Sequence, residues 1–139
     1  GAWEGPVNLE AQTTLDAQVD AKKSELQALI PELVFGFEDE SLESVLGKML
    51  LERRLQFGTA ESCTGGYIAH LITSVPGASA YFPGSIVSYS YEMKTKLLGV
   101  RPDTLIQQGA VSEETVREMV AGALDTLHVD IALAVSGIA

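Results

Sequence analysis

The sequence contains few of the residues on which several classes of protein depend. Of its 139 residues one is cysteine, two are histidines and 6% are aromatic. The single cysteine, Cys63, cannot form an internal disulfide, which excludes a secreted scaffold held together by disulfides. The two histidines, His70 and His128, lie far apart in the chain, without Cys or carboxylate partners at ligand spacing. The sequence therefore predicts no metal site.

Basic residues and long apolar runs are also scarce. Nine Lys and Arg stand against 19 Asp and Glu, for a formal net charge of −10. Such a chain lacks the basic face that neutralises phosphates, so we expect no direct contact with nucleic acid or anionic lipid. No run approaches the roughly 18 apolar residues of a bilayer span, and the first residues do not form a signal peptide. These absences predict a cytoplasmic protein with no membrane partner.

What is present is enough for a globular protein, since 46% of the residues are hydrophobic and 20% are charged. The acidic run at residues 38–40 separates two kinds of sequence. Before it, apolar residues recur at helical spacing over 15–30 up to Pro31, and residues 33–37 are typical of a short strand. One helix and one strand cannot bury a core. We therefore expect residues 1–38 to be a helix-strand remnant, the tail of a preceding small domain plus a linker.

After the acidic run, predicted helices alternate with short apolar strands. Ser41 and Ser112 are typical N-caps, and Gly99 is a typical C-cap. The predicted helices cover about residues 42–50, 64–73, 91–98 and 113–127, and the predicted strands cover 55–60, 84–90 and 131–135. This alternation predicts the α/β class: a three-layer α/β/α sandwich with a mostly parallel or mixed sheet.

Two loops follow predicted strands, where open α/β sheets carry their sites. Residues 59–66 (Thr-Ala-Glu-Ser-Cys-Thr-Gly-Gly) combine hydroxyls, a carboxylate, a thiol and two glycines. Glycines let a ligand approach the backbone, and the N–H groups of the following helix favour an anion or an oxyanion. The alternative is a capped helix start with tightly packed glycines, since the loop is neither a Walker A nor a Gly-x-Ser-x-Gly motif. The second loop is residues 136–139.

Ser62 and Cys63 are both candidate nucleophiles, and Cys63 could equally be a small buried hydrophobic residue. No histidine neighbours the loop, so the base would be a lysine held neutral. Lys94 lies near a helix start, where the helix dipole disfavours a cation and lowers the pKa of the amine. Tyr89 could orient this lysine or relay a proton. The alternative is that Lys94 and Lys96 are solvated helix residues.

Several short blocks of the sequence match one family in their order and spacing. The blocks are residues 59–66, 76–79, 82–84, 89–94, 98–100, 109–112 and 136–139. They resemble the C-terminal domain of the competence/damage-inducible CinA proteins, which is similar to stand-alone nicotinamide-nucleotide amidohydrolases. The resemblance covers about residues 39–139. Residues 1–38 resemble the end of the middle domain of full-length CinA.

The resemblance implies a deamidase that converts nicotinamide mononucleotide to nicotinic acid mononucleotide and ammonia, without a cofactor and as a homodimer. The family's catalytic serine, tyrosine and lysine fall on Ser62, Tyr89 and Lys94. The substrate is then expected to contact the rest of the two loops. These predicted substrate-binding residues are Glu61, Cys63, Thr64, Gly65, Gly66, Ser136 and Gly137.

The chain departs from the family pattern in three respects. The family continues past Gly-Ile-Ala with a glycine-rich loop, a strand and a helix, so we expect the domain over residues 39–139 to lack part of its substrate pocket. Ser136 stands where many members have threonine. The N-terminal domain of full-length CinA, associated with metal-dependent hydrolysis of ADP-ribose, has no counterpart here, so that activity is not assigned.

A second hypothesis is a catalytically silent domain that binds a nucleotide or a partner and regulates competence or the response to DNA damage, because a fold alone does not fix a function. Ligand binding without ammonia release would distinguish it. A serine peptidase is the weakest alternative, since nothing in the sequence indicates an extended groove for a peptide.

Overall fold

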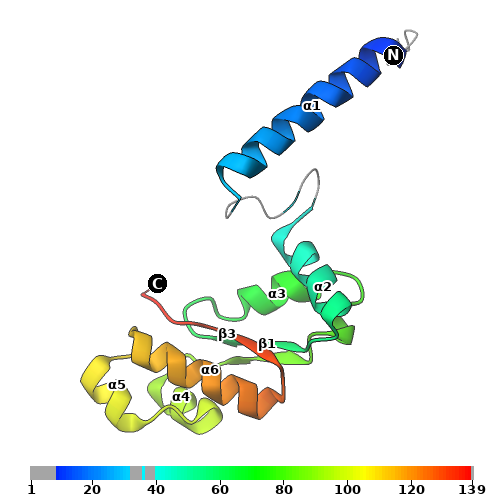
Figure 1. Cartoon of the computed structure of the whole chain (residues 1–139). Helices are drawn as coiled ribbons and strands as arrows, with labels where there is room; N and C mark the ends of the chain where they lie inside the picture. Colours follow the sequence, from blue (N-terminus) through cyan, green and yellow to red (C-terminus); the bar gives the residue numbers. More distant parts are fainter. Residues whose placement is uncertain (1–8, 32–35, 37–39, 139) are drawn as a thin grey trace, which may run out of the picture. The chain divides into compact units, whose positions relative to one another are not determined.

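The computed structural model describes residues 9–31, 36 and 40–138, and it falls into two compact units, residues 1–40 and 41–139. In its described part, the first unit contains the helix α1 (Leu9–Leu29; Figure 1). Leu15 and Leu26 on this helix are exposed. The strand predicted over residues 33–37 lies, except for residue 36, outside the described residues. That residues 1–38 are the tail of another domain stays a prediction.

The second unit is built on a three-stranded sheet in the order β2-β1-β3. Its strands are β1 (Phe57–Glu61), β2 (Gly84–Val87) and β3 (Ile131–Val135). Both pairings are parallel, and the register places Glu61 beside Val87 on one side and Val135 on the other. The carboxyl ends of all three strands therefore meet at one edge of the sheet.

Helices cover both faces of this sheet, with α2 and α3 on one face and α4, α5 and α6 on the other (Figure 1). The bounds are α2 (Leu42–Arg53), α3 (Tyr67–Thr73), α4 (Tyr91–Leu98), α5 (Pro102–Gln108) and α6 (Glu113–Leu127), with a short 3₁₀ helix, η1 (Ala78–Ala80). The predicted α/β class and three layers are confirmed. The sheet is parallel throughout in the described part of the chain.

Each face of the sheet has its own apolar core. The core under α2 and α3 contains Leu50, Phe57, Ile72, Ala78, Tyr81 and Phe82. The core under α4 to α6 contains Ala60, Leu98, Val100, Leu105, Met119 and Ala123. On this second face a Cβ at Gly122 would lie 1.9 Å from the Leu98 carbonyl oxygen, so only glycine lets α6 approach the end of α4 this closely.

The predicted caps are confirmed, and most differences lie at the ends of elements. The side chains of Ser41 and Ser112 accept N–H groups in the first turns of α2 and α6, and Gly99 ends α4 with φ 67°. The strand predicted over 84–90 ends at Val87, because Ser90 already caps α4. The short helix α5 was not predicted, although a proline at its first position is a recognised start signal.

Candidate active site

Ser62 lies directly after β1, at the edge where the carboxyl ends of the strands meet. Its N–H donates to the Val135 carbonyl at 3.0 Å, which continues the ladder between β1 and β3. One residue earlier, the Glu61 carbonyl accepts the Ser88 N–H at 2.8 Å. Ser62 is buried, with 6% of its surface exposed. Both neighbouring strands thus fix the backbone that carries this hydroxyl.

Lys94 reaches the same point from α4. Its Nζ lies 2.8 Å from Ser62 Oγ, 2.7 Å from the Ser88 carbonyl oxygen and 3.1 Å from the Tyr89 carbonyl oxygen. The residue is fully buried, whereas Lys96 is exposed. The hypothesis that both lysines are solvated is therefore wrong for Lys94. The structure brings Ser62 and Lys94 together across 32 residues of sequence.

The surroundings of Lys94 favour a neutral amine. Burial lowers the pKa of Lys94 from its ordinary value, and the nearby Cys63 acts in the opposite direction. Within the described part of the chain, no carboxylate forms an ion pair with Lys94. Carbonyl oxygens only accept hydrogen bonds. A neutral amine would thus donate its two N–H groups to the carbonyls of residues 88 and 89 and direct its lone pair at Ser62 Oγ.

Glu61, the residue before Ser62, faces the start of α3. Its side-chain oxygens accept the N–H groups of Gly66, Ile68 and Ala69 at 3.0, 3.1 and 2.8 Å. Burial raises the pKa of Glu61, but these hydrogen bonds and the adjacent Thr64 hydroxyl bring it below the ordinary value. The hydroxyl itself makes no hydrogen bond of ordinary geometry within the described residues. The Glu61 carboxylate therefore takes up the N–H groups at the start of α3 that would otherwise be open to a ligand.

The other predicted residues of the loop after β1 lie around Ser62. Gly65 and Gly66 have φ values of 59° and 100°, and the Gly65 N–H donates to the Ser62 carbonyl at 3.1 Å. Cys63 is half-buried and lies beside Gly137, where an added Cβ would be 3.0 Å from the sulfur. The predicted loop 59–66 therefore lies against the second predicted loop at Gly137.

Ser136 and Tyr89 take positions that the sequence did not reveal. The Ser136 hydroxyl donates to the Ala110 carbonyl at 2.6 Å, which places the loop before α6 beside the end of β3. The Tyr89 side chain is 71% exposed, and its contact with Lys94 is made by the backbone carbonyl. Ser88 also contacts Lys94 through its backbone carbonyl, and this contact was not predicted from the sequence. A backbone contact leaves no signal in the side-chain pattern.

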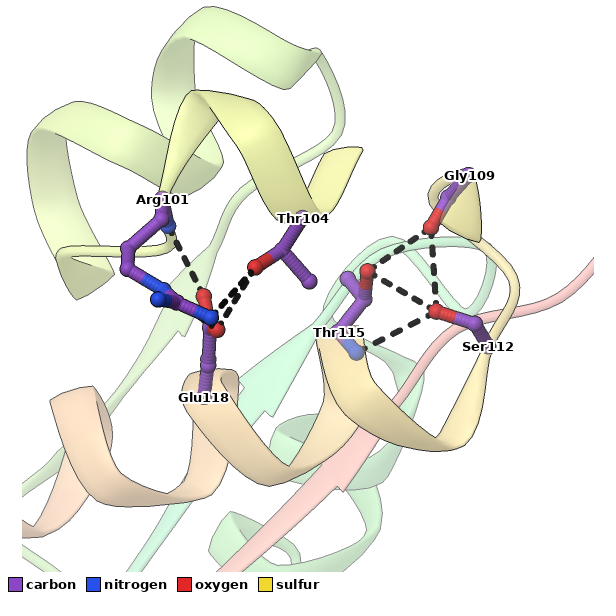
Figure 2. A network of polar contacts seen from close by, with 6 residues as sticks. All are labelled: Arg101, Thr104, Gly109, Ser112, Thr115 and Glu118. Atoms are coloured by element: carbon purple, nitrogen blue, oxygen red, sulfur yellow. Dashed lines mark hydrogen bonds and ion pairs between the residues drawn. The ribbon is translucent and has the colours of Figure 1, made fainter. Parts of the chain in front are cut away.

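A second polar cluster lies where α5 meets α6 (Figure 2). The Glu118 carboxylate accepts the Arg101 backbone N–H at 2.8 Å, the Arg101 Nε–H at 3.0 Å and the Thr104 hydroxyl at 2.7 Å. The backbone hydrogen bond from Arg101 is the main cause that lowers the pKa of Glu118. Beside it, the Gly109 carbonyl accepts the hydroxyls of Ser112 and Thr115. This cluster joins two helices.

The fold and the site define an α/β sandwich domain with a buried serine–lysine pair at the carboxyl edge of a parallel sheet. The family model described as the CinA C-terminal domain matches residues 39–139. The chain belongs to this family. No helix in the described ranges is long and apolar enough to cross a membrane.

Curated relatives and solved structures agree with this membership. A CinA-like protein of Endomicrobium trichonymphae is 46% identical over 125 residues, which is 90% of this chain and 29% of that protein. A CinA-like protein of Leptospira borgpetersenii serovar Hardjo-bovis (strain L550) is 57% identical over 94 residues, 68% of this chain and 22% of that protein. The chain thus spans less than a third of the length of these relatives.

Two solved structures share the fold. A competence-damaged protein (CinA) superfamily protein from Escherichia coli has a TM-score of 0.70 at 30% identity, covering 76% of this chain and 64% of that one. The competence damage-inducible protein A of Klebsiella pneumoniae has a TM-score of 0.68 at 40% identity, covering 69% of this chain and 60% of that one.

Proposed function

We propose that this domain hydrolyses the carboxamide of nicotinamide mononucleotide, with Ser62 as the nucleophile and Lys94 as its base. One observation carries the proposal: a fully buried lysine, with no carboxylate partner among the described residues, has its Nζ 2.8 Å from a buried serine hydroxyl. The resemblance of residues 39–139 to nicotinamide-nucleotide amidohydrolases supports this substrate. A homodimer and a cytoplasmic location stay predictions.

In the proposed reaction, Lys94 accepts the proton of the Ser62 hydroxyl while Oγ attacks the amide carbon. The lysine, now an ammonium, donates this proton to the amide nitrogen, and ammonia leaves as an acyl-serine forms. A water molecule then attacks the acyl carbon, and Lys94 takes its proton and returns it to Ser62 Oγ. Such general acid–base transfer works best when the pKa of the base lies near the working pH. Burial moves the pKa of Lys94 in that direction.

The negative oxygen formed during the attack needs hydrogen-bond donors. The N–H groups of Gly66, Ile68 and Ala69 are bonded to Glu61, so the first turn of α3 has none of these to offer. Within the described residues the N–H groups of Cys63 and Thr64 have no acceptor. They directly follow the nucleophile, which is where α/β-hydrolases place one of their oxyanion donors. We therefore assign the oxyanion to these two groups.

The test is ammonia release from nicotinamide mononucleotide by the protein purified at its full natural length. We expect release by the unaltered protein and by the matched controls Ser74→Ala and Lys96→Met, which change exposed residues of the same types. Ammonia release should fall to background in Ser62→Ala and by about 10²- to 10⁴-fold in Lys94→Met. Calorimetry would show whether the nucleotide still binds. Binding without any ammonia release by the unaltered protein would contradict the proposal and favour a silent nucleotide-binding domain.

A further inference from the structure

We infer that Glu61 is a positioning residue for Ser62, in place of the substrate contact predicted from the sequence: its buried carboxylate holds the loop that carries the nucleophile. The inference rests on the proposed function only in taking Ser62 as the nucleophile. Glu61 is fully buried. It directly precedes Ser62, so any movement of Glu61 is passed to the backbone of the serine.

The Glu61 carboxylate connects the start of the loop, at the end of β1, to the first turn of α3. Oε2 accepts the N–H groups of Gly66 and Ile68, and Oε1 accepts that of Ala69. These groups lie five, seven and eight residues after Glu61. The Glu61 carbonyl is at the same time bonded to Ser88 in the neighbouring strand. Residues 62–65 are thus held between two fixed ends, β1 and the first turn of α3.

Two hydroxyls complete the environment of the carboxylate. The Thr59 hydroxyl lies 3.3 Å from Oε1, and the Ser85 hydroxyl lies 3.5 Å from the same oxygen. The two hydroxyl oxygens are also 2.7 Å apart, so one hydroxyl donates to the other and the other donates to the carboxylate. They come from β1 and β2, so the side chain of Glu61 connects both strands to α3. A buried carboxylate with this many donors is fixed in one rotamer.

The placement of this negative charge matters for the base. A carboxylate paired with Lys94 would favour the ammonium form and make the lysine a poorer base. The charge of Glu61 is directed at backbone N–H groups of α3 instead, and Lys94 has no acidic partner in the described part of the chain. Glu61 therefore orders the nucleophile without stabilising the protonated base. Replacing it should change the rate and leave the pH midpoint of the reaction unchanged.

Glu61→Gln tests the inference, because one oxygen that accepts N–H groups becomes an NH₂ group that cannot. The first readout is the rate at which a fluorophosphonate probe labels Ser62, which does not depend on the natural substrate. We expect labelling to slow 10- to 100-fold, as for a small misplacement of a reacting group. Its pH midpoint should not move. In ammonia release, kcat should fall while KM changes less than about threefold.

Two further variants keep the result interpretable. Glu118→Gln removes another multiply bonded carboxylate, in the cluster between α5 and α6 (Figure 2), whose hydrogen bonds within the described residues do not involve Ser62 or Lys94. It should lower thermal stability while leaving the labelling rate within about twofold. Thr59→Val removes one donor to Glu61 and should slow labelling by a few-fold, which covers the case in which Glu61→Gln does not fold.

Three results would overturn the inference. The first is labelling of Glu61→Gln, or of Thr59→Val where Glu61→Gln does not fold, at the unaltered rate. The second is a shifted pH midpoint, which would make Glu61 part of the titrating system. The third is a raised KM with unchanged kcat, the signature of a direct substrate contact. If the unaltered protein releases no ammonia but Glu61→Gln still slows labelling of Ser62, the proposed function fails and the positioning role stands.

Discussion

Two polar clusters of this domain use similar residues in opposite ways. In one, the Lys94 amine is buried beside Ser62 and two backbone carbonyls, without an acidic partner in the described residues. In the other, Arg101 and Thr104 surround the Glu118 carboxylate (Figure 2). Burial lowers the pKa of Lys94, whereas hydrogen bonds, first that of the Arg101 backbone, lower the pKa of Glu118.

The difference separates a reactive group from a structural one. A pKa that burial lowers means that the charged form of the lysine is destabilised, so the fold loses stability whenever the lysine is protonated. A pKa lowered by partners means that the charged form is stabilised, and the fold gains. We therefore expect the first cluster to serve the reaction at a cost in stability, and the second to serve stability alone.

The largest expected effect is on activity. Lys94→Met removes the base and should lower kcat for ammonia release about 10²- to 10⁴-fold, the usual range for general acid–base catalysis. Arg101→Met, in the second cluster, should change kcat less than twofold. Steady-state kinetics on both variants measures the contrast. Similar losses in the two variants would mean that Lys94 acts only through the fold.

Substitutions in the two clusters should change the free energy of unfolding in opposite directions. Glu118→Gln leaves N–H and hydroxyl donors without their charged acceptor and should lower the free energy of unfolding by about 1–2 kcal/mol. Lys94→Met replaces a buried amine by an apolar side chain of similar length and should leave stability equal or higher at neutral pH. Urea unfolding of both variants measures this. A clear destabilisation by Lys94→Met would show that the ammonium is well compensated.

The titration of Lys94 and Glu118 should also make the free energy of unfolding depend on pH. This effect is smaller than those of the substitutions, and its sign follows from the direction of each pKa shift. Between the lowered pKa of folded Lys94 and the ordinary value of 10.5, the unfolded chain binds more protons, so stability rises with pH across this window. The pKa of Glu118 is lowered from 4.5, so its contribution is present above 4.5 and is lost as the pH falls through the folded value. The difference between the unaltered protein and each variant, measured against pH, should show the two windows separately.

The smallest expected effect concerns Tyr89. Its side chain is 71% exposed and its backbone carbonyl makes the contact with Lys94, so the phenol is not needed to hold the lysine. Tyr89→Phe should therefore lower kcat less than about tenfold. A loss above about 10²-fold would instead assign the hydroxyl a role in proton transfer.

The sequence was sufficient for the fold because caps and apolar periods are local signals. Ser41 and Ser112 marked helix starts, and the run from Ile131 to Val135 marked a strand. The short helix α5 was not predicted, because seven residues are too few to show a periodic pattern of apolar residues.

The site was harder to predict than the fold. Ser62 and Lys94 were candidates from their residue types and from the resemblance, but their contact depends on how α4 packs, which no local pattern records. The partners of Glu61 are backbone N–H groups, which every residue except proline has, and so its role could not be read from composition.

The central claim is that Lys94 is a buried lysine whose amine is held in its neutral form. It can be tested by following the amine signals of isotopically labelled lysine by NMR from pH 6 to 11, with Lys94→Met to assign the signal. The account predicts that Lys94 titrates well below the other lysines and at the midpoint of the pH–rate profile of Ser62 labelling. Titration of Lys94 at or above 10.5 would contradict it.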